Sequence, residues 1–484
     1  MTVHGGDVWQ VGEELGIAAP EILDFSANIN PRGLPPRARE RLERDASDAR
    51  LLMFYPDPSA RLLRGALSKQ LAVSADAIVI GPGAESLLAP ILRYLQPMRA
   101  LVPVPAFGEY RRVCEQEQIE FSPFPLERSE LFRMPVERLC ESIEAESPGV
   151  VLLNNPHNPS GAMLEPHEVR RVLDAASSLA VGFGASATSS GHSVSSRIAG
   201  FGACAKPPAD ARGSVRSHDR EGAVSGQSAH SASSPTAGFG AGAKPLADAR
   251  GSVRGHDREG VVSGQSGHSI SSPTLGFGAN AKPLAHARGS DRSGHSINSS
   301  GATLVLDEAF IDYVPHASLV REAANRPGLI VVRSLTKFYG CPALRVGYAV
   351  AHPDTILAIR SLLPTWPVTQ LASDTLAEAV ADRGYAEASL RENAVERERL
   401  ADSLSRLGLA GFPSAANYLL LELRADMPAA SELRARLIAK HRILIRNCDS
   451  YEGLARGRYV RVAVRSGEEN CRLIQALAEE LRVP

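Results

Sequence analysis

Cysteine is scarce in this chain of 484 residues, and the few thiols lie far apart. Cys-x-x-Cys pairs are typical of zinc sites, and closely spaced cysteines are typical of the disulfide frameworks of small secreted domains. Neither spacing occurs among the six cysteines, which are Cys114, Cys140, Cys204, Cys341, Cys448 and Cys471. We therefore expect reduced thiols, no disulfide framework and no metal site.

Long apolar runs and a net charge are also missing. The sequence has no run of 18 apolar residues, and the opening MTVHGGDVWQ lacks the basic flank and apolar stretch of a signal peptide. Lys and Arg together number 53 against 54 for Asp and Glu, so no overall field attracts nucleic acid or anionic lipid. We expect a soluble, cytoplasmic protein that binds neither nucleic acid nor membranes.

One internal block, residues 179–300, is depleted in apolar residues and repeats itself. Its Gly-Phe-Gly tripeptides at Gly200, Gly238 and Gly276 recur every 38 residues. Repeats that stack need an apolar face, but only 18 of these 122 residues are Leu, Ile, Val or Phe. The composition predicts a long disordered insert in one surface connection of the fold. A metal-binding or RNA-binding arm is the less favoured alternative.

The rest of the chain alternates short apolar strands with helical stretches. The candidate strands are residues 77–80, 100–104, 149–153, 303–307, 329–334 and 346–350. This alternation predicts an α/β fold with a mostly parallel sheet covered by helices on both faces. Ligands of such sheets bind beyond the carboxyl ends of the strands.

Polar residues cluster at these strand ends. A glycine turn, Gly81-Pro-Gly-Ala-Glu-Ser86, opens a helix whose N–H groups could bind a phosphate, although such turns are common and most are structural. Asn154-Asn-Pro-His-Asn-Pro-Ser-Gly161 follows another strand. Asp307 closes a third strand, where a buried carboxylate needs a cationic or N–H partner. These ends are the candidate site.

Lysine is rare, and one lysine stands out. Of six lysines, three occupy equivalent places in the repeat and two lie in polar helical stretches, whereas Lys337 follows a strand at the mouth of the sheet. Desolvation and the nearby Arg345 would lower the pKa of Lys337 and make its amine a nucleophile toward a carbonyl. The alternative is an ion-pairing surface lysine.

Three segments in this order, NNPHNPSG, LVLDEAFIDY and SLTKFYGCPALRVGY, resemble fold-type I pyridoxal-phosphate enzymes. They are most similar to the branch that holds histidinol-phosphate aminotransferases and threonine-phosphate decarboxylases. The resemblance implies a large domain (residues 35–178 and 301–349), a smaller α+β C-terminal domain (350–484) and an N-terminal arm (1–34). It also implies pyridoxal 5′-phosphate as cofactor and a homodimer.

The resemblance assigns a role to each residue around that cofactor. Lys337 resembles the lysine that binds the cofactor aldehyde covalently, and Asp307 the carboxylate that pairs with the pyridine nitrogen and keeps it protonated. Asn158 matches the asparagine that contacts the 3′ oxygen of the ring. The remaining cofactor contacts are the stacking Phe107, the phosphate cradle of Gly83, Ala84, Glu85, Ser334 and Arg345, and Tyr55, which a partner subunit would lend.

The resemblance also places the substrate. Arg461 resembles the arginine that binds the substrate carboxylate, and Arg446 the one that binds a substrate phosphate, since guanidinium suits both anions. The openings HGGDVWQVGEELG and LDFSANINPRGLP are similar to those of threonine-phosphate decarboxylases. They add His4 and Asn30, beside Asn158, to the expected substrate contacts.

Phe310 departs from the pattern of the aminotransferases, which carry tyrosine at this place of the DEAY motif. Its ring offers no hydroxyl to the 3′ oxygen.

From the N-terminal openings, we expect decarboxylation of L-threonine O-3-phosphate to (R)-1-aminopropan-2-yl phosphate, a step of cobalamin biosynthesis. The alternatives are a histidinol-phosphate aminotransferase and, in another class, an interaction protein built on a decayed enzyme core.

Overall fold

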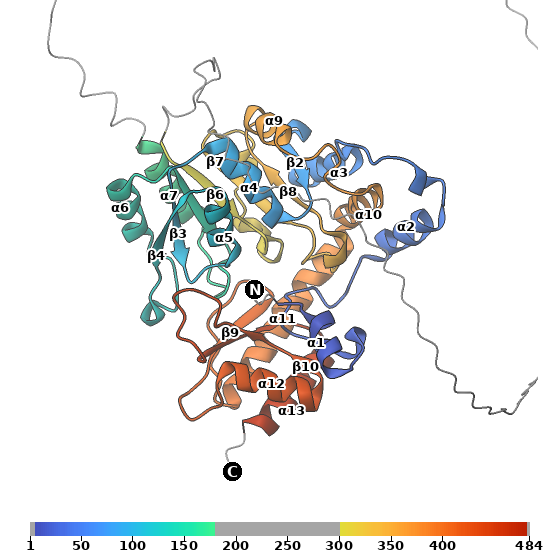
Figure 1. Cartoon of the computed structure of the whole chain (residues 1–484), viewed down its shortest axis with the longest axis vertical. Coiled ribbons are helices and arrows are strands. Elements are labelled where there is room, and N and C mark those ends of the chain that lie inside the picture. The colour runs from blue at the N-terminus through green and yellow to red at the C-terminus, as the bar shows by residue number, and fades with distance from the viewer. Residues whose placement is uncertain (1–4, 180–300, 482–484) are drawn as a thin grey trace, which may run out of the picture. The chain divides into compact units, whose positions relative to one another are not determined.

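A seven-stranded sheet organises the larger part of the protein (Figure 1). The computed structural model describes residues 5–179 and 301–481, so the repeats of the 179–300 block lie outside the described residues. The strand order is β2-β8-β7-β6-β5-β3-β4, and every neighbouring pair is parallel except the two that involve β8. The predicted mostly parallel sheet is confirmed.

The sequence predicted six of the seven strands of this sheet to within one residue and missed β4, whose residues are mostly exposed or half-buried. The strands are β2 (Ile78–Gly81), β3 (Arg99–Val104), β4 (Glu120–Pro125), β5 (Val150–Asn154), β6 (Thr303–Asp307), β7 (Leu329–Ser334) and β8 (Gly347–Val350). The helices around them are α2 (Pro36–Ser47), α3 (Arg61–Leu71), α4 (Ala84–Leu95), α5 (Glu109–Gln116), α6 (Val136–Glu146), α7 (Pro166–Ser178), α8 (Val320–Ala323), α9 (Pro353–Ser361) and α10 (Gln370–Ala381).

Both faces of the sheet are buried. Along β6, Leu304 and Leu306 pack into one apolar cluster with residues of α3, α6, α7 and α10, while Val305 packs into a second with residues of α4, α5 and α9. Successive strand residues point to opposite faces, so a strand covered on both sides must be apolar throughout. This explains why these strands read as continuous apolar runs rather than as alternating ones.

The repeat block interrupts a single connection, between α7 and β6. The α7 helix begins with a capping box of Glu165 and Glu168 and ends at Ser178. On the far side of the block, the N–H of Ala302 donates to the carbonyl of Ala176 at 2.8 Å. The two flanks therefore meet, and β6 pairs with β5 and β7 as it would after a short loop.

A second, smaller sheet lies in the C-terminal part. It has the antiparallel order β11-β12-β9, with β9 (Tyr418–Glu422), β11 (Arg446–Asn447) and β12 (Tyr459–Ala463). Its apolar cluster includes residues of α11 (Arg383–Arg406), α12 (Ala430–His441) and α13 (Gly467–Glu480).

The N-terminal segment packs against this C-terminal part. Strand β1 (Leu23–Asp24) pairs in parallel with β10 (Ile443–Leu444), and Val11 of α1 (Val8–Leu15) shares a cluster with Ile438 of α12. Figure 1 shows α1 in blue beside α12 and β10, from the opposite end of the chain. The expected domain boundary at residue 350 assigns α9 and α10 to the small domain. In the structure, α9 contacts β2, and α10 contacts α2 and α3, beside the large sheet.

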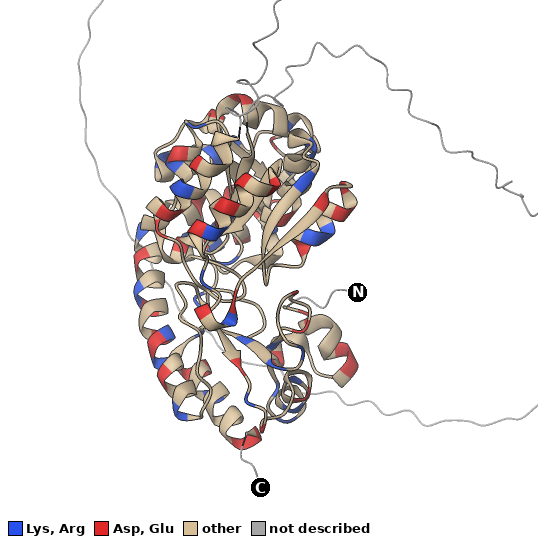
Figure 2. Cartoon of the chain, turned by 90° about the vertical axis from the view of Figure 1, so that its left-hand side faces the viewer, with Lys and Arg blue, Asp and Glu red and all other residues tan. Residues whose placement is uncertain are grey.

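Charges of both signs are interspersed along the described helices (Figure 2). Several form ion pairs one helical turn apart, such as Arg39 with Glu43 and Arg436 with Glu432. Among the described residues, none of the helices combines the length and the hydropathy that a membrane span requires.

Candidate active site

The strand ends meet at one edge of the large sheet, as their parallel arrangement requires. Asn154 at the end of β5 is the register partner of Asp307 at the end of β6. Gly347, the first residue of β8, pairs with both Ser334 at the end of β7 and Gly81 at the end of β2. The candidate residues from four segments of the sequence are thereby brought to one edge.

Lys337 lies three residues beyond β7 and is partly buried, and its Nζ is 5.1 Å from the centroid of the Phe310 ring. Desolvation lowers the pKa of this amine to about 8, and the positive charges of Arg345 and Arg461 act in the same direction. The negative charge of Asp307 opposes them. The charges of Lys337 and Asp307 therefore interact in the structure. With a pKa of about 8, the amine is mostly neutral above that pH.

Asp307 is held by two donors. Its Oδ2 accepts from the Tyr110 hydroxyl at 2.5 Å, and its Oδ1 accepts from the N–H of Ala309 at 2.9 Å. Burial raises the pKa of this carboxyl, and the Tyr110 hydrogen bond and the charge of Lys337 work against that rise. A cation placed opposite the carboxylate would lower the pKa further.

The glycine turn after β2 forms a cradle with Arg345. Gly83 has φ 108° and precedes α4, and a Cβ built on it would lie 3.1 Å from Nη2 of Arg345. Gly347 packs so closely on this turn that an added Cβ would be 2.3 Å from the nitrogen of Ala84. Ser334 adds a hydroxyl, which lies 2.8 Å from that of Thr336.

This donor set fits a phosphate. A helix N-terminus presents N–H groups without intrahelical partners, and guanidinium and hydroxyl groups complete the coordination of a dianion. A phosphorylated aldehyde with a basic ring nitrogen matches the cradle, the amine and the carboxylate together. The side chain of Glu85 points to a different partner, Arg112, so that only its backbone is available to the cradle.

Asn158 lies where the two sheets meet. Its Oδ1 accepts from Nη1 of Arg461 at 2.5 Å and from the hydroxyl of Tyr451 at 3.1 Å. Arg461 on β12 is the direct cross-strand partner of Arg446 on β11, so both side chains leave the same face of the small sheet. Two guanidinium groups side by side can bind two anions.

Three of the expected contacts are placed elsewhere or lie outside the described residues. Tyr55 is 79% exposed and stacks on Trp366, with 4.4 Å between ring centroids, so within one chain it faces outward. Asn30 directs its amide donors to the carbonyl of Phe338 at 2.8 Å and to the Ser389 hydroxyl at 2.9 Å. His4 lies outside the described residues.

Asn30 therefore stabilises the backbone of the segment that carries Lys337. Its backbone N–H also donates to the carbonyl of Lys337 at 3.0 Å. A substrate contact of this side chain stays a prediction.

Several residues around the site were not found from the sequence. Phe107 meets Tyr110 edge to face, with 5.9 Å between centroids. His157 is fixed between the Ser160 hydroxyl at 2.7 Å and the carbonyl of Pro105 at 2.8 Å, and burial lowers its pKa to about 4, so that the ring is neutral. The spacing of one helical turn between Phe107 and Tyr110 was a usable signal for Tyr110. The contact of Tyr451 with Asn158 had none, because it joins two distant segments.

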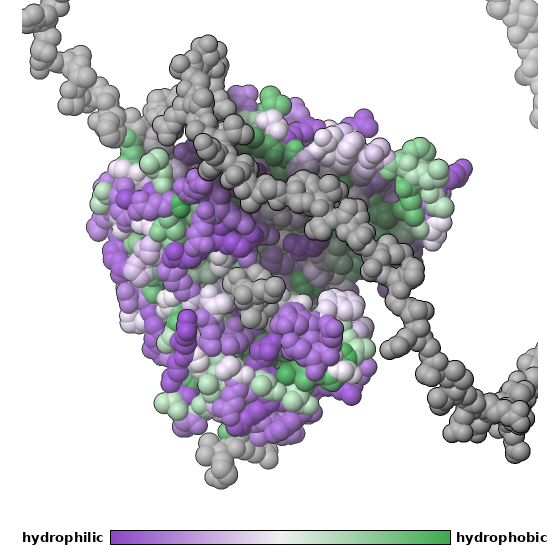
Figure 3. Space-filling model, viewed as in Figure 1, coloured by the Kyte–Doolittle hydropathy of each residue, from purple (hydrophilic) through white to green (hydrophobic). Residues whose placement is uncertain are grey.

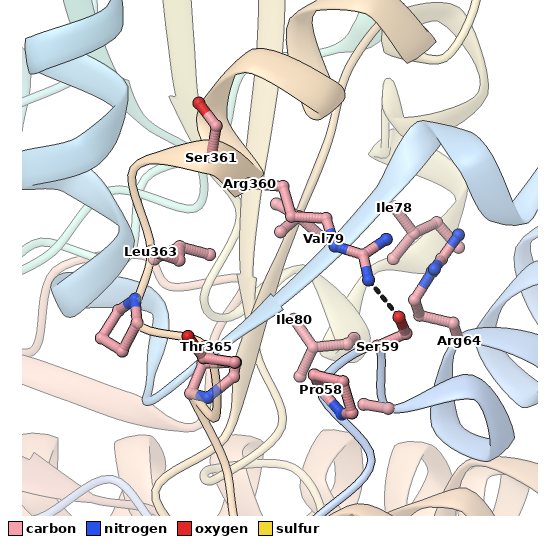
Figure 4. Close-up of a pocket in the computed structure, with 13 residues that line it drawn as sticks. Pro58, Ser59, Arg64, Ile78, Val79, Ile80, Arg360, Ser361, Leu363 and Thr365 are labelled. Atoms are coloured by element: carbon pink, nitrogen blue, oxygen red, sulfur yellow. Dashed lines mark hydrogen bonds between the residues drawn. The ribbon is translucent and has the colours of Figure 1, made fainter.

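A separate hollow of about 300 Å³ lies between α3, β2 and residues 360–367 (Figure 4). Its walls carry Arg64 and Arg360, and the figure shows Arg360 directed at Ser59, to which it donates. None of the predicted site residues is among those that line it. The chemistry predicted from the sequence therefore belongs to the strand ends and not to this hollow.

Comparison with known proteins identifies the family. The sequence matches the family Aminotransferase class I and II over residues 20–181 and 295–477. The chain is 26% identical to a threonine-phosphate decarboxylase of Salmonella typhimurium, over 99% of this chain and 97% of that protein. It is 23% identical to an adenosylcobalamin biosynthesis bifunctional protein, CobDQ, of Leptospira interrogans, over 98% of this chain but only 40% of that protein.

The fold gives the same result. The crystal structure of a histidinol-phosphate aminotransferase from Sinorhizobium meliloti in complex with pyridoxal-5′-phosphate superposes with a TM-score of 0.65 at 19% identity, over 98% of this chain and 94% of that one. The predicted fold-type I architecture is thereby confirmed. The chain belongs to the aminotransferase class I and II family, and its cofactor is pyridoxal 5′-phosphate.

Proposed function

We propose that this chain decarboxylates L-threonine O-3-phosphate to (R)-1-aminopropan-2-yl phosphate, the reaction that fits cobalamin biosynthesis. The observation that carries the proposal is the pair of arginines, Arg446 and Arg461, directly opposite each other on β11 and β12. The substrate has two anionic groups, a carboxylate and a phosphate, and each suits one guanidinium fork. The likeness over the full length of a threonine-phosphate decarboxylase points the same way.

The proposed cofactor contacts are those that the family resemblance implies, and the strand-end geometry supports them. Lys337 binds the aldehyde, Asp307 pairs with the ring nitrogen, and Phe107 stacks on the ring. The cradle of Gly83, Ala84, Glu85, Ser334 and Arg345 holds the cofactor phosphate. When bound, the cofactor withdraws electrons from the α-carbon of an amino-acid substrate.

The orientation of the substrate by Arg446 and Arg461 determines which bond at the α-carbon breaks. Arg461 binds the substrate carboxylate and is itself oriented by Asn158 and Tyr451. Arg446 binds the substrate phosphate. Two fixed anions at opposite ends of the substrate set its rotation, so the bond to CO2 and not the bond to hydrogen is held for cleavage. Lys337 is released from the aldehyde when the substrate amine takes its place, and after CO2 leaves, its Nζ, in the ammonium form, would deliver a proton to the α-carbon.

The proposed active form is a homodimer. Five consecutive apolar or aromatic residues, Leu51, Leu52, Met53, Phe54 and Tyr55, are exposed, together with Trp366. Figure 3 shows green surface at the right-hand edge, over the segment that follows α2 in Figure 1. A second copy would cover this surface, and Tyr55 would then reach the cofactor phosphate of the partner.

A histidinol-phosphate aminotransferase is the second candidate, because the fold superposes on one over almost the whole chain. Phe310 argues for the decarboxylase, since the aminotransferases resembled by this sequence carry tyrosine there. Both candidates bind an amine and a phosphate, so phosphate binding alone does not separate them.

The deciding experiment supplies each substrate to the purified enzyme loaded with pyridoxal phosphate. We expect threonine phosphate to release CO2, measured with a coupled bicarbonate assay, and to give 1-aminopropan-2-yl phosphate, detected by ³¹P NMR. Histidinol phosphate with 2-oxoglutarate should give no glutamate. Glutamate formation without CO2 release from threonine phosphate would reject the decarboxylase. Lys337→Ala serves as the inactive control in both assays.

A further inference from the structure

Tyr110 makes a contact that the proposed reaction has not yet used. It lies in the first turn of α5, is 2% exposed, and donates its hydroxyl to Oδ2 of Asp307 at 2.5 Å. The contact joins residues 197 positions apart in the sequence. The same helical turn begins just after Phe107, whose ring meets that of Tyr110 edge to face.

We propose that Tyr110 is the positioning residue that keeps Asp307 as an oriented carboxylate and thereby sets how tightly the protein holds the cationic ring nitrogen of its cofactor. This inference rests on the proposed role of Asp307. Residues 107–110 would then contribute two interactions to the cofactor. Phe107 contacts the face of the pyridine ring, and Tyr110 orients the carboxylate that binds the ring nitrogen.

The surroundings of Asp307 show why a further donor is needed. Desolvation of the carboxyl favours its protonated, neutral form, which binds a cation poorly. Two other titratable groups interact electrostatically with Asp307. They are Lys337, beyond β7, and Tyr418, on β9. In its proposed role the Lys337 amine binds the cofactor aldehyde, so it is not free to stay opposite the carboxylate as a counterion.

The phenol of Tyr110 is suited to this task because it stays protonated. Burial and the negative charge of Asp307 raise its pKa well above the usual value. It therefore remains a donor between pH 5 and pH 8. The N–H of Ala309 holds the other oxygen, so the two donors together fix the rotation of the carboxylate.

Tyr110→Phe tests this inference, because it keeps the ring and removes only the hydroxyl. The dissociation constant of pyridoxal phosphate is measured by absorbance titration of the cofactor-free protein between pH 5 and pH 8. We expect binding about tenfold weaker, the effect of losing one hydrogen bond to a charged acceptor. We also expect the loss of affinity on acidification to begin at higher pH than in the wild type, because the carboxyl protonates more readily.

Tyr385→Phe is the matched control. Tyr385 also buries a phenol donor, bonded to the carbonyl of Gly33 at 2.6 Å, and lies on α11. It should cost similar thermal stability and leave the cofactor constant and its pH profile unchanged. Equal behaviour of the two variants would overturn the inference.

Two further variants keep the result decisive. If Tyr110→Phe does not fold, 3-fluorotyrosine at position 110, a stronger donor, should move the acidic limb to lower pH, and no movement would reject the inference. Asp307→Asn separates the two levels of the argument. Weak binding in Asp307→Asn with wild-type binding in Tyr110→Phe rejects Tyr110 alone, whereas wild-type binding in Asp307→Asn rejects the proposed role of Asp307.

Discussion

The two faces of the large sheet behind the site hold buried charges in different ways. On the site face, Asp307 and Lys337 lie at the strand ends, and burial shifts the pKa of each toward its neutral form. On the opposite face, Glu308 directly follows Asp307, the last residue of β6, and Arg333 of β7 precedes Ser334. Because successive residues of an extended chain alternate between faces, each face carries one acid from the end of β6 or the residue after it, and one cation from β7 or beyond it.

The opposite face satisfies its charges within the protein. Glu308 accepts from the Ser318 hydroxyl at 2.6 Å and from the N–H of Leu319 at 2.8 Å. Arg333 donates to Asp312 at 2.5 Å and lies 3.9 Å from Glu308. On the site face, we propose that the amine of Lys337 binds the cofactor. The two faces therefore differ in that one pairs its buried charges within the protein and the other places them where we propose that the chemistry occurs.

Lys337→Ala should have the largest effect on function and little on stability. We expect turnover to fall about a thousandfold or more and the visible absorbance band of the lysine-bound cofactor to disappear. The free energy of unfolding of the cofactor-free protein should stay the same or rise, since a desolvated amine is removed. A persisting band would show that another amine binds the cofactor.

Arg333→Met should do the reverse. It leaves Glu308 and Asp312 buried without the cation that faces them, so unfolding of the cofactor-free protein in urea should become easier by about 3–5 kcal/mol. The control is Arg326→Met, whose partners Asp174 and Glu322 keep 66% and 23% of their side-chain surface exposed, and the expected loss there is below about 1 kcal/mol. Similar losses in both variants would mean that the buried network is not a stabilising one.

Phe310→Tyr sharpens the comparison within the site face. Phe310 packs edge to face on Tyr418, with 4.9 Å between centroids, and its ring faces Lys337. The hydroxyl of the new tyrosine should donate to the 3′ oxygen of the bound cofactor. This hydrogen bond should favour the deprotonated form of the lysine-bound cofactor. The pH titration of the visible band should move to lower pH by about one unit, the effect of one charge-assisted hydrogen bond. An unchanged titration would place Phe310 away from the cofactor.

The smallest expected effect is on the pH dependence of stability. Lys337 has a pKa of about 8 in the folded protein against an ordinary value of 10.5, so between these pH values the unfolded chain binds more protons at this residue. The contribution of Lys337 to stability must therefore rise with pH across this window. Wild-type stability minus that of Lys337→Ala, from urea denaturation of the cofactor-free proteins, should increase from pH 8 to pH 10. A constant difference would contradict the depressed pKa.

Much of the fold and part of the site could be predicted because the signals are local. Continuous apolar runs marked the buried strands. Asp307, the last residue of β6, and Lys337, three residues beyond β7, therefore had to lie at one edge once the strands were parallel. Arg446 and Arg461 were correctly expected in separate strands, but their direct opposition depends on the register of β11 and β12.

The contacts that join distant segments could not be predicted. The expected substrate contact of Asn30 stays a prediction, but the hydrogen bond of its amide to the backbone of Phe338 depends on how the N-terminal segment packs. The spacing from Phe107 was a local signal for Tyr110, but the partner of its hydroxyl depends on where Asp307 lies.

The sequence by itself determined the secondary structure, the order of the strand-end motifs and the chemical types of the site residues, because periodicity and turn chemistry act over a few residues. Only the tertiary structure decided which donor holds which acceptor. A hydrogen bond such as that between Tyr110 and Asp307 requires two atoms within about 3 Å, and that distance is set by the packing of whole helices and strands.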